Sequence, residues 1–179
     1  MRTDPGFREL RTERLLLRRS LPGDAEAISA YRSDPTVHEH QGWSRTDPDY
    51  VRGEIEEMLR RAPGETGWVQ FTVETLQDGR LVGDVGLSPR ADEPGVVMLG
   101  YTIDPSEQRK GYATEAMGAV AAYALDVLGA DLLRAYADAG NVASVRVAEK
   151  VGLEIVERFE GTDQGETWHG VRMERRRTD

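Results

Sequence analysis

The sequence predicts an α/β (α+β) fold in which a mixed, mostly antiparallel central sheet of about seven strands is flanked by about four helices. Three observations support this prediction. Short apolar runs alternate along the chain with segments of helical periodicity. Three strand-like runs follow one another between residues 67 and 103, which is typical of an antiparallel meander. A long alanine-rich segment, residues 111–128, then keeps its larger apolar side chains at helical spacing.

Each expected element has a local signal in the sequence. The expected strands are runs rich in leucine, β-branched and aromatic residues, and they span 14–19, 67–75, 80–87, 96–103, 132–137, 153–159 and 167–175. The expected helices have apolar residues three or four positions apart, and they span 25–31, 47–61, 111–128 and 142–151. Asp78-Gly79 is a hairpin turn signal, and Gly129 and Gly152 end the last two helices.

Length and charge limit the possible classes of protein. The 179 residues fit a single domain, 1–179, in which the polar residues 1–12 are expected to be a loose lead-in. The formal charge of −9 argues against nucleic acid as a partner and is compatible with a cationic acceptor such as an amine. No window is long enough for a membrane span, and no signal-peptide core is present. We therefore expect a cytoplasmic protein without a membrane partner.

The composition also limits the chemistry. There are no cysteines, so disulfides, thiolate metal sites and a cysteine nucleophile are excluded. The three histidines, His38, His40 and His169, lack metal-ligand spacing, and no metal is expected.

The junction between the strand 96–103 and the helix 111–128 has the features of an anion-binding site. A polar loop ends at Gly111, where no side chain blocks approach to the backbone. The first turn of a helix carries unpaired N–H groups and the positive end of the helix dipole. Arg109 and Lys110 add positive charge at the same point. The junction predicts a phosphate-binding loop without Walker or Gly-x-Gly-x-x-Gly spacing. The alternative is an ordinary turn with a solvated basic loop.

Three segments carry a family resemblance. Residues 108–113, Gln-Arg-Lys-Gly-Tyr-Ala, resemble the Gln/Arg-x-x-Gly-x-Gly/Ala signature of the GCN5-related N-acetyltransferases, the GNAT superfamily. Residues 12–18, Thr-Glu-Arg-Leu-Leu-Leu-Arg, are similar to the opening of its RimJ/RimL-like branch. Residues 141–153 resemble the family's second block, Asn-x-x-Ser/Ala followed by Glu-Lys-x-Gly-Phe.

The resemblance implies a GNAT-like fold and acetyl-coenzyme A (CoA) as the co-substrate. In the family, the backbone amides of the loop hold the pyrophosphate, and a splay or bulge near the end of the preceding strand exposes backbone groups to the pantetheine arm. The residues that the resemblance implies for cofactor binding are Thr102, Ile103, Gln108, Arg109, Lys110, Gly111, Tyr112, Ala113, Thr114 and Asn141.

Acetyl transfer to an amine needs a positioned thioester, a polarised carbonyl, a neutral amine and an acid for the leaving thiolate. Many relatives supply that acid with a tyrosine, where this chain has Ala148. The RimJ/RimL-like branch implies Ser144 as the substitute, although Ser144 could instead only bond to the helix start. Glu160 and Asp163 are candidates for the base, with surface charges in a turn or a water chain as the alternatives.

The acceptor is expected to be a primary amine, either a protein N-terminal α-amine or a small molecule. His40, Trp43 and Tyr101 are the expected acceptor-binding residues, although a tryptophan in a polar loop could equally plug a small core. Homodimers are common in the family. The alternative function is a non-catalytic sensor or scaffold that binds CoA or acyl-CoA, which the missing tyrosine favours. A protein-interaction module without a cofactor is disfavoured by the intact loop.

Overall fold

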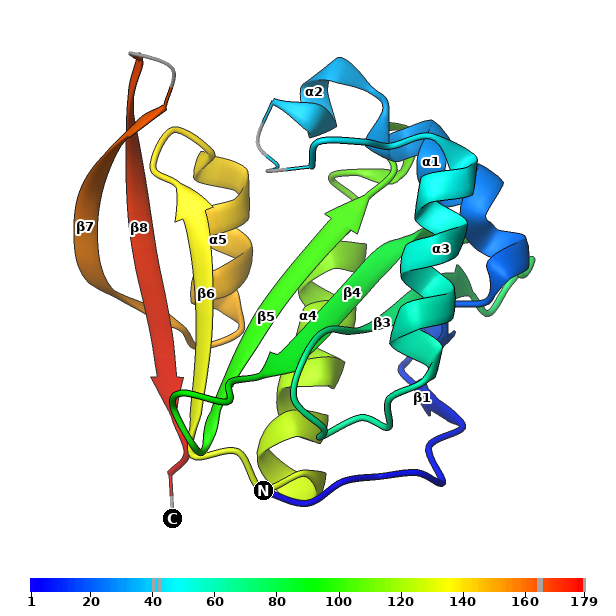
Figure 1. The fold of residues 1–179 in the computed structure, drawn as a ribbon, viewed down its shortest axis with the longest axis horizontal. Coiled ribbons are helices and arrows are strands. Elements are labelled where there is room, and N and C mark those ends of the chain that lie inside the picture. Colours follow the sequence, from blue (N-terminus) through cyan, green and yellow to red (C-terminus); the bar gives the residue numbers. More distant parts are fainter. Residues whose placement is uncertain (40, 42, 164–165, 179) are drawn as a thin grey trace.

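One sheet of eight strands forms the centre of the protein in a computed structural model that describes residues 1–39, 41, 43–163 and 166–178. The strand order is β1-β2-β3-β4-β5-β6-β8-β7 (Figure 1). The strands are β1 (Glu9–Arg11), β2 (Leu15–Arg19), β3 (Val69–Thr75), β4 (Leu81–Pro89), β5 (Val96–Ile103), β6 (Leu132–Asp138), β7 (Glu154–Asp163) and β8 (Glu166–Arg176).

The pairing confirms the expected mostly antiparallel sheet. All neighbouring strands are antiparallel except β5 and β6, which run parallel. The sheet has one strand more than the expected number. The extra strand, β1, lies inside the expected loose lead-in, and its Leu10 is paired with Leu17 of β2. Three residues are too few to show a strand period, so the backbone pairing with β2 was not visible in the sequence.

The structure has five α-helices rather than about four. They are α1 (Ala25–Arg32), α2 (Pro35–His38), α3 (Pro48–Leu59), α4 (Tyr112–Ala122) and α5 (Val142–Lys150). The unexpected α2 is capped by Asp34, whose side chain accepts a hydrogen bond from the N–H of Thr36 at 2.9 Å. The expected long helix after residue 111 divides into α4 and a π-helical turn, Tyr123–Val127. None of the helices in the described ranges has the length and apolar character that a bilayer crossing requires.

Helices cover both faces of the central strands. α1 and α3 pack together beside β3 and β4, and α4 passes behind β4 and β5 (Figure 1). The larger core lies between the sheet and α4, where Phe71, Val85 and Met117 are fully buried. A smaller core, centred on Ile28 and Ile55, joins α1 to α3. Because strand side chains alternate between faces, β4 sends Val85 into the larger core and Asp84 toward α1 and α3.

Candidate active site

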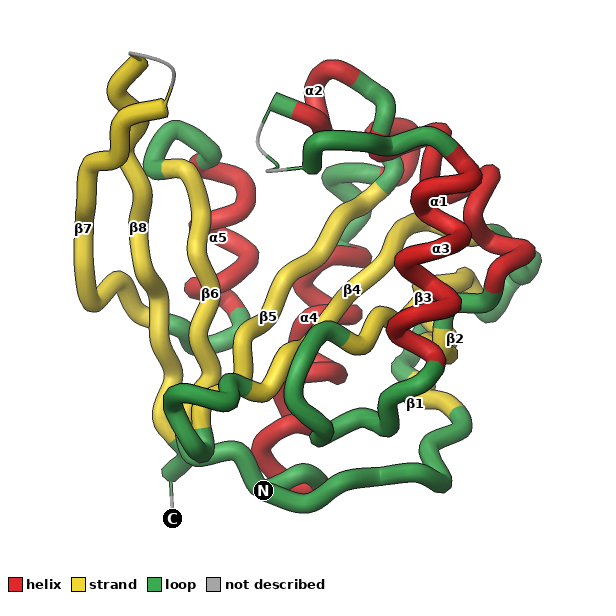
Figure 2. Tube along the Cα trace, in the orientation of Figure 1, coloured by secondary structure: helices red, strands yellow, loops and turns green. Residues whose placement is uncertain are grey.

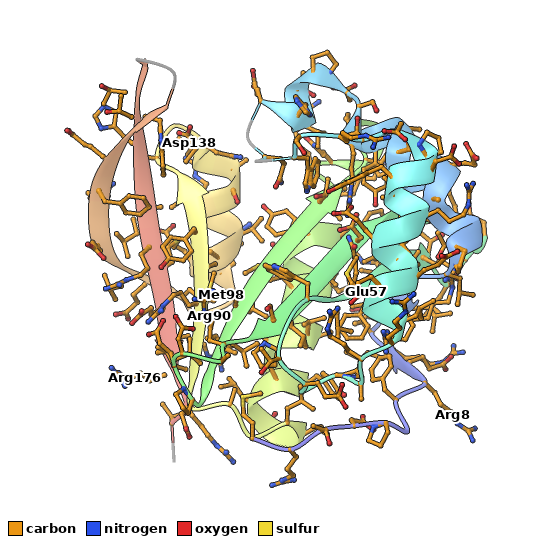
Figure 3. All side chains as sticks on the ribbon, viewed as in Figure 1. Arg8, Glu57, Arg90, Met98, Asp138 and Arg176 are labelled. Atoms are coloured by element: carbon orange, nitrogen blue, oxygen red, sulfur yellow. The ribbon has the colours of Figure 1, made fainter. Side chains whose placement is uncertain are left out.

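The parallel strands β5 and β6 pair briefly and then separate. Residues 96–98 pair with residues 132–134, and no pairing follows although β5 continues to Ile103. Figure 2 shows the separation widening along the strands. Figure 3 labels Met98 near its closed end and Asp138 near its open end. The backbone N–H and C=O groups on this edge of β5 are therefore free to bond a ligand.

A cavity of about 730 Å³ lies at this separation, and we call it the donor cavity. Its walls come from the end of β5, the loop 104–111, the first turn of α4 and the start of α5. All of the residues expected to bind the cofactor line it, from Thr102 to Thr114 and at Asn141. Ser144 and Tyr101 line it too. The structure thus brings the two sequence motifs together at one site.

Short-range hydrogen bonds hold the loop between β5 and α4. Asp104 Oδ1 accepts from the N–H of Ser106 at 2.8 Å. Gln108 Nε2 donates to the carbonyl of Ile103 at 3.2 Å. The first bond closes a turn in which the aspartate side chain accepts a hydrogen bond from the backbone N–H two residues later. The amide of Gln108 therefore supports the loop from within, beside any role toward a ligand.

Two residues with left-handed backbone conformation end the loop. Arg109 has a φ of 62° and Gly111 a φ of 85°. A positive φ is uncommon for a residue with a side chain, so Arg109 is held there by its surroundings. After Gly111, the first turn of α4 lines the cavity, and its N–H groups have no acceptor one turn earlier. These donors, the helix dipole and the two basic side chains suit a phosphate group.

Glu107 is a buried carboxylate in this loop that the sequence did not single out. It is only 4% exposed and forms ion pairs with Arg80 Nη1 at 2.7 Å and Lys110 Nζ at 2.8 Å. The pairing holds Lys110 at the rim of the donor cavity. Neither ion pair was readable from the sequence. Three-residue spacing brings side chains together on a helix, but Lys110 lies in the loop before α4, and Arg80 comes from the turn between β3 and β4.

Glu115 fixes the start of α4 to the segment between β1 and β2. Its Oε1 accepts from Thr12 Oγ1 at 2.6 Å and from the N–H of Arg14 at 2.9 Å, and its Oε2 accepts from Arg14 Nε at 2.7 Å. Arg14 Nη1 also donates to the carbonyl of Lys110 at 3.0 Å. Burial tends to raise the pKa of Glu115, but the hydrogen bonds from Thr12 and Arg14 outweigh it and hold the pKa below its usual value.

The start of α5 places a hydroxyl in the donor cavity. Asn141 Oδ1 accepts from the N–H of Ser144 at 3.0 Å, which is an ordinary helix cap. Ser144 and Tyr101 of β5 both line this cavity. Burial raises the pKa of Tyr101, and the neighbouring hydroxyl of Ser144 partly opposes that rise. Ala148 is buried and offers no proton.

A second cavity, of about 410 Å³, adjoins the first, and we call it the acceptor cavity. Gln41, Tyr101 and Thr102 line both. Its other walls include Trp43 and Trp68. The two cavities therefore meet at the end of β5, where a group could pass from one to the other.

A family comparison identifies the chain. A model of the acetyltransferase (GNAT) domain matches residues 14–154, which is most of the sequence. The chain belongs to the GNAT acetyltransferase family. It is thus an acyltransferase that transfers acetyl groups. It is 28% identical to the uncharacterized N-acetyltransferase YoaA of Bacillus subtilis (strain 168), over 83% of this chain and 84% of that protein.

Solved structures share the GNAT fold. The acetyltransferase (GNAT family) from Bacillus anthracis superposes with a TM-score of 0.82 at 24% identity, covering 94% of this chain and 98% of that one. A spermidine N-acetyltransferase from Vibrio cholerae, in complex with CoA and spermine, gives a TM-score of 0.78 at 18% identity, covering 92% and 96%. At these identities the likeness concerns the fold.

The other expected site residues of this GNAT chain lie in different places. Trp43 lines the acceptor cavity, and its ring covers the guanidinium of Arg32 at 4.5 Å. His40 lies outside the described residues. Glu160 lies on β7, exposed and 3.4 Å from His169 Nδ1, and lines neither cavity. The backbone of Asp163 ends β7, and its side chain lies outside what the structure describes.

No group of three or more histidine, aspartate or glutamate side chains within the described ranges is arranged to hold a metal ion. Three buried polar residues of the acceptor cavity, Arg32, Gln70 and Asp84, were not predicted from the sequence. They come from α1, β3 and β4, and no local motif marks them.

Proposed function

We propose that this GNAT chain transfers the acetyl group of acetyl-CoA to a primary amine by direct attack within a ternary complex. The observation that carries the proposal is the meeting of two separate cavities at Gln41, Tyr101 and Thr102. Donor and acceptor can then be bound at once, with the reacting groups at the shared wall. The chain has no cysteine for a thioester intermediate, which also favours direct attack.

The chemistry of the donor cavity suits acetyl-CoA. The unpaired N–H groups of the first turn of α4, with Arg109 and Lys110, are suited to the pyrophosphate. The unpaired edge of β5 offers N–H and C=O groups to the amides of the pantetheine arm, and an N–H there can polarise the thioester carbonyl. Acetyl-CoA supplies the activated acetyl group. The protein positions this acetyl group next to the amine.

Tyr101 and Ser144 supply a proton donor at the shared wall. When the neutral amine nitrogen attacks the carbonyl carbon, the carbon–sulfur bond breaks, the nitrogen gives up a proton and the thiolate takes one up. Ser144 lines the donor cavity, and its hydroxyl lies near the phenol of Tyr101, whose pKa it lowers and which lines both cavities. This pair takes the place of the tyrosine that Ala148 replaces. It therefore favours catalysis over the alternative of a non-catalytic CoA sensor.

Release of CoA tests the proposal directly. The protein is incubated with acetyl-CoA and a panel of amines that includes N-terminal peptides, polyamines, aminoglycosides and arylalkylamines, and free thiol is measured. We expect release that depends on the acceptor, with the acetylated amine identified by mass. Tight binding of acetyl-CoA without release for any amine would overturn the transferase proposal and support the sensor.

A further inference from the structure

We infer that the acceptor is a monoamine whose amino group is carried on a flat apolar body, as in an arylalkylamine, and that polyamines are poor acceptors. This inference rests on the proposed function, because it names the acceptor for the same site. It follows from two independent features of the acceptor cavity. Its carboxylates are already neutralised by arginines, and its open walls are aromatic.

Two carboxylates of α3 face the acceptor cavity, and both are paired. Glu57 Oε2 bonds Arg60 Nη1 at 2.7 Å, and Glu57 Oε1 bonds Arg61 Nη2 at 2.6 Å (Figure 3 labels Glu57). Glu54 Oε2 lies 3.2 Å from Nη1 of Arg32, which is itself buried in the cavity wall. A cation that entered the cavity would have to compete with these arginines for either carboxylate.

The third carboxylate of the cavity, Asp84, is also satisfied. It is 3% exposed, accepts hydrogen bonds from the phenol of Tyr31 and the amide of Gln70, and lies 3.8 Å from Arg32 Nη2. Burial and the charge of Asp84 raise the pKa of Tyr31, which keeps the phenol as a donor.

In the described part of the wall, the three carboxylates are thus paired with arginines: Glu54 and Asp84 share Arg32, which lines the cavity, and Glu57 pairs with Arg60 and Arg61, which lie outside it. A polyamine carries several cations along an apolar chain, and an unpaired carboxylate best replaces the lost hydration of each. The described lining offers no unpaired carboxylate, so binding a polyamine would cost more than binding a single amino group.

The open walls of the cavity are apolar and flat. Gly86 of β4 and Gly100 of β5 pair directly across the sheet and form a floor without side chains. The indole of Trp68 lies over this floor, since a Cβ added at Gly86 would come within 3.1 Å of Trp68 Cε3. Trp68 is nevertheless 45% exposed, so the rest of its surface is available. Trp43 and Met58 complete an apolar lining that suits an aromatic ring.

The same apolar lining assists the chemistry. An amine must be neutral to attack, and transfer out of water disfavours its charged form. A monoamine whose ring displaces water from Trp43 and Trp68 brings its amino group to the shared wall partly dehydrated, which lowers its pKa. The described residues of the cavity hold no unpaired carboxylate to act as a base, and desolvation reduces the need for one.

Matched acceptors test this inference. We compare kcat/KM for 2-phenylethylamine, ethylamine and spermidine, with CoA release as the readout. We expect 2-phenylethylamine to exceed both of the others by at least about ten-fold, since apolar groups in such pockets discriminate by this order. A preference for spermidine, or equal values for 2-phenylethylamine and ethylamine, would overturn the inference and leave the transferase proposal intact. Absence of release with any amine would overturn the transferase proposal itself.

Two variants separate the aromatic and the charge arguments. Trp68→Ala should lower kcat/KM for 2-phenylethylamine about ten-fold more than for ethylamine. Trp168→Ala, a similarly exposed tryptophan on β8 that lines neither cavity, should leave that ratio unchanged. Unchanged affinity for acetyl-CoA checks the fold, and Trp68→Phe replaces the alanine variant if that protein does not fold. If the ratio of kcat/KM for 2-phenylethylamine to that for ethylamine is the same in all of these proteins, Trp68 does not contribute to acceptor choice.

The charge argument predicts a gain in activity toward spermidine. The double variant Arg60→Gln with Arg61→Gln leaves Glu57 unpaired at the cavity wall, and kcat/KM for spermidine should rise several-fold while the value for ethylamine changes less. If spermidine gains nothing over ethylamine, the pairing of Glu57 does not govern acceptor choice, and that part of the inference is wrong.

Discussion

The hydroxyl of Ser144 on α5 lies near the phenol of Tyr101 on β5, across the separated strands, and lowers the pKa of that phenol. Both residues line the donor cavity, and Tyr101 lines the acceptor cavity as well. The pair therefore lies where donor and acceptor meet. We propose for it a role in proton transfer, beyond the start of a helix and the wall of a cavity.

Removing the phenol hydroxyl should slow turnover. We expect Tyr101→Phe to lower kcat about 100-fold, the usual order for loss of a general acid. The ring remains, so the dissociation constant for acetyl-CoA should stay within about two-fold. Steady-state kinetics and calorimetry measure the two effects separately. Tyr136→Phe is the control, since Tyr136 lies exposed on β6 against Phe159 and lines neither cavity. An unchanged kcat in Tyr101→Phe would show that the phenol is structural.

The pKa of Tyr101 should depend on its burial and on the hydroxyl of Ser144. Burial raises its pKa above the ordinary 10.0, so the phenol keeps its proton as the pH rises toward that value. The hydroxyl of Ser144 lowers this pKa, so Ser144→Ala should shift it further upward and should reduce turnover more than acetyl-CoA affinity. The tyrosinate absorbance of each protein, minus that of the same protein with Tyr101→Phe, measures the shift. A downward shift in Ser144→Ala would contradict this interaction.

A side chain at Gly111 should block the donor cavity. Gly111 has a φ of 85°, and a Cβ there would lie 3.2 Å from Arg14 Nη2. Gly111→Glu adds a carboxylate beside the proposed pyrophosphate site, and we expect acetyl-CoA affinity to fall at least about 100-fold, on the order of 3 kcal/mol. Gly129→Ala is the matched control, since Gly129 also has a positive φ, of 74°, but lies outside the cavity. Gly129→Ala should lower stability without lowering acetyl-CoA affinity. If Gly129→Ala and Gly111→Glu lose the same affinity, the cause is a folding defect.

The donor side of the site could be predicted from sequence because its parts are local. Residues 108–113 are contiguous, and Asn141 and Ser144 lie within one helical turn. Motif and element order were therefore enough to bring them together. The missed elements, β1 and α2, have three and four residues, which is too short for a hydrophobic period to appear.

The acceptor side could not be predicted in the same way. Arg32, Trp68 and Asp84 come from α1, the residue before β3, and β4, and the sheet alone makes them neighbours. The proximity of Tyr101 and Ser144 depends on the separation of β5 from β6, a non-local property of the sheet. Sequence reasoning named both residues but had no means to join them.

The carboxylate of Glu115 should make stability depend on pH. Its pKa lies below the ordinary 4.5 in the folded protein, so its contribution is complete above 4.5 and is lost as the pH falls through the folded value. Because Arg14 is 46% exposed, solvent screens the pair, and we expect Glu115→Gln to cost only about 1 kcal/mol at pH 7. We measure the free energy of unfolding of both proteins in urea at pH 7 and again near pH 3. The difference between the unchanged protein and Glu115→Gln should shrink toward zero at the lower pH. Glu26→Gln, an exposed glutamate of α1, should show no such trend. A constant difference at both pH values would mean that Glu115 acts by packing and not by charge.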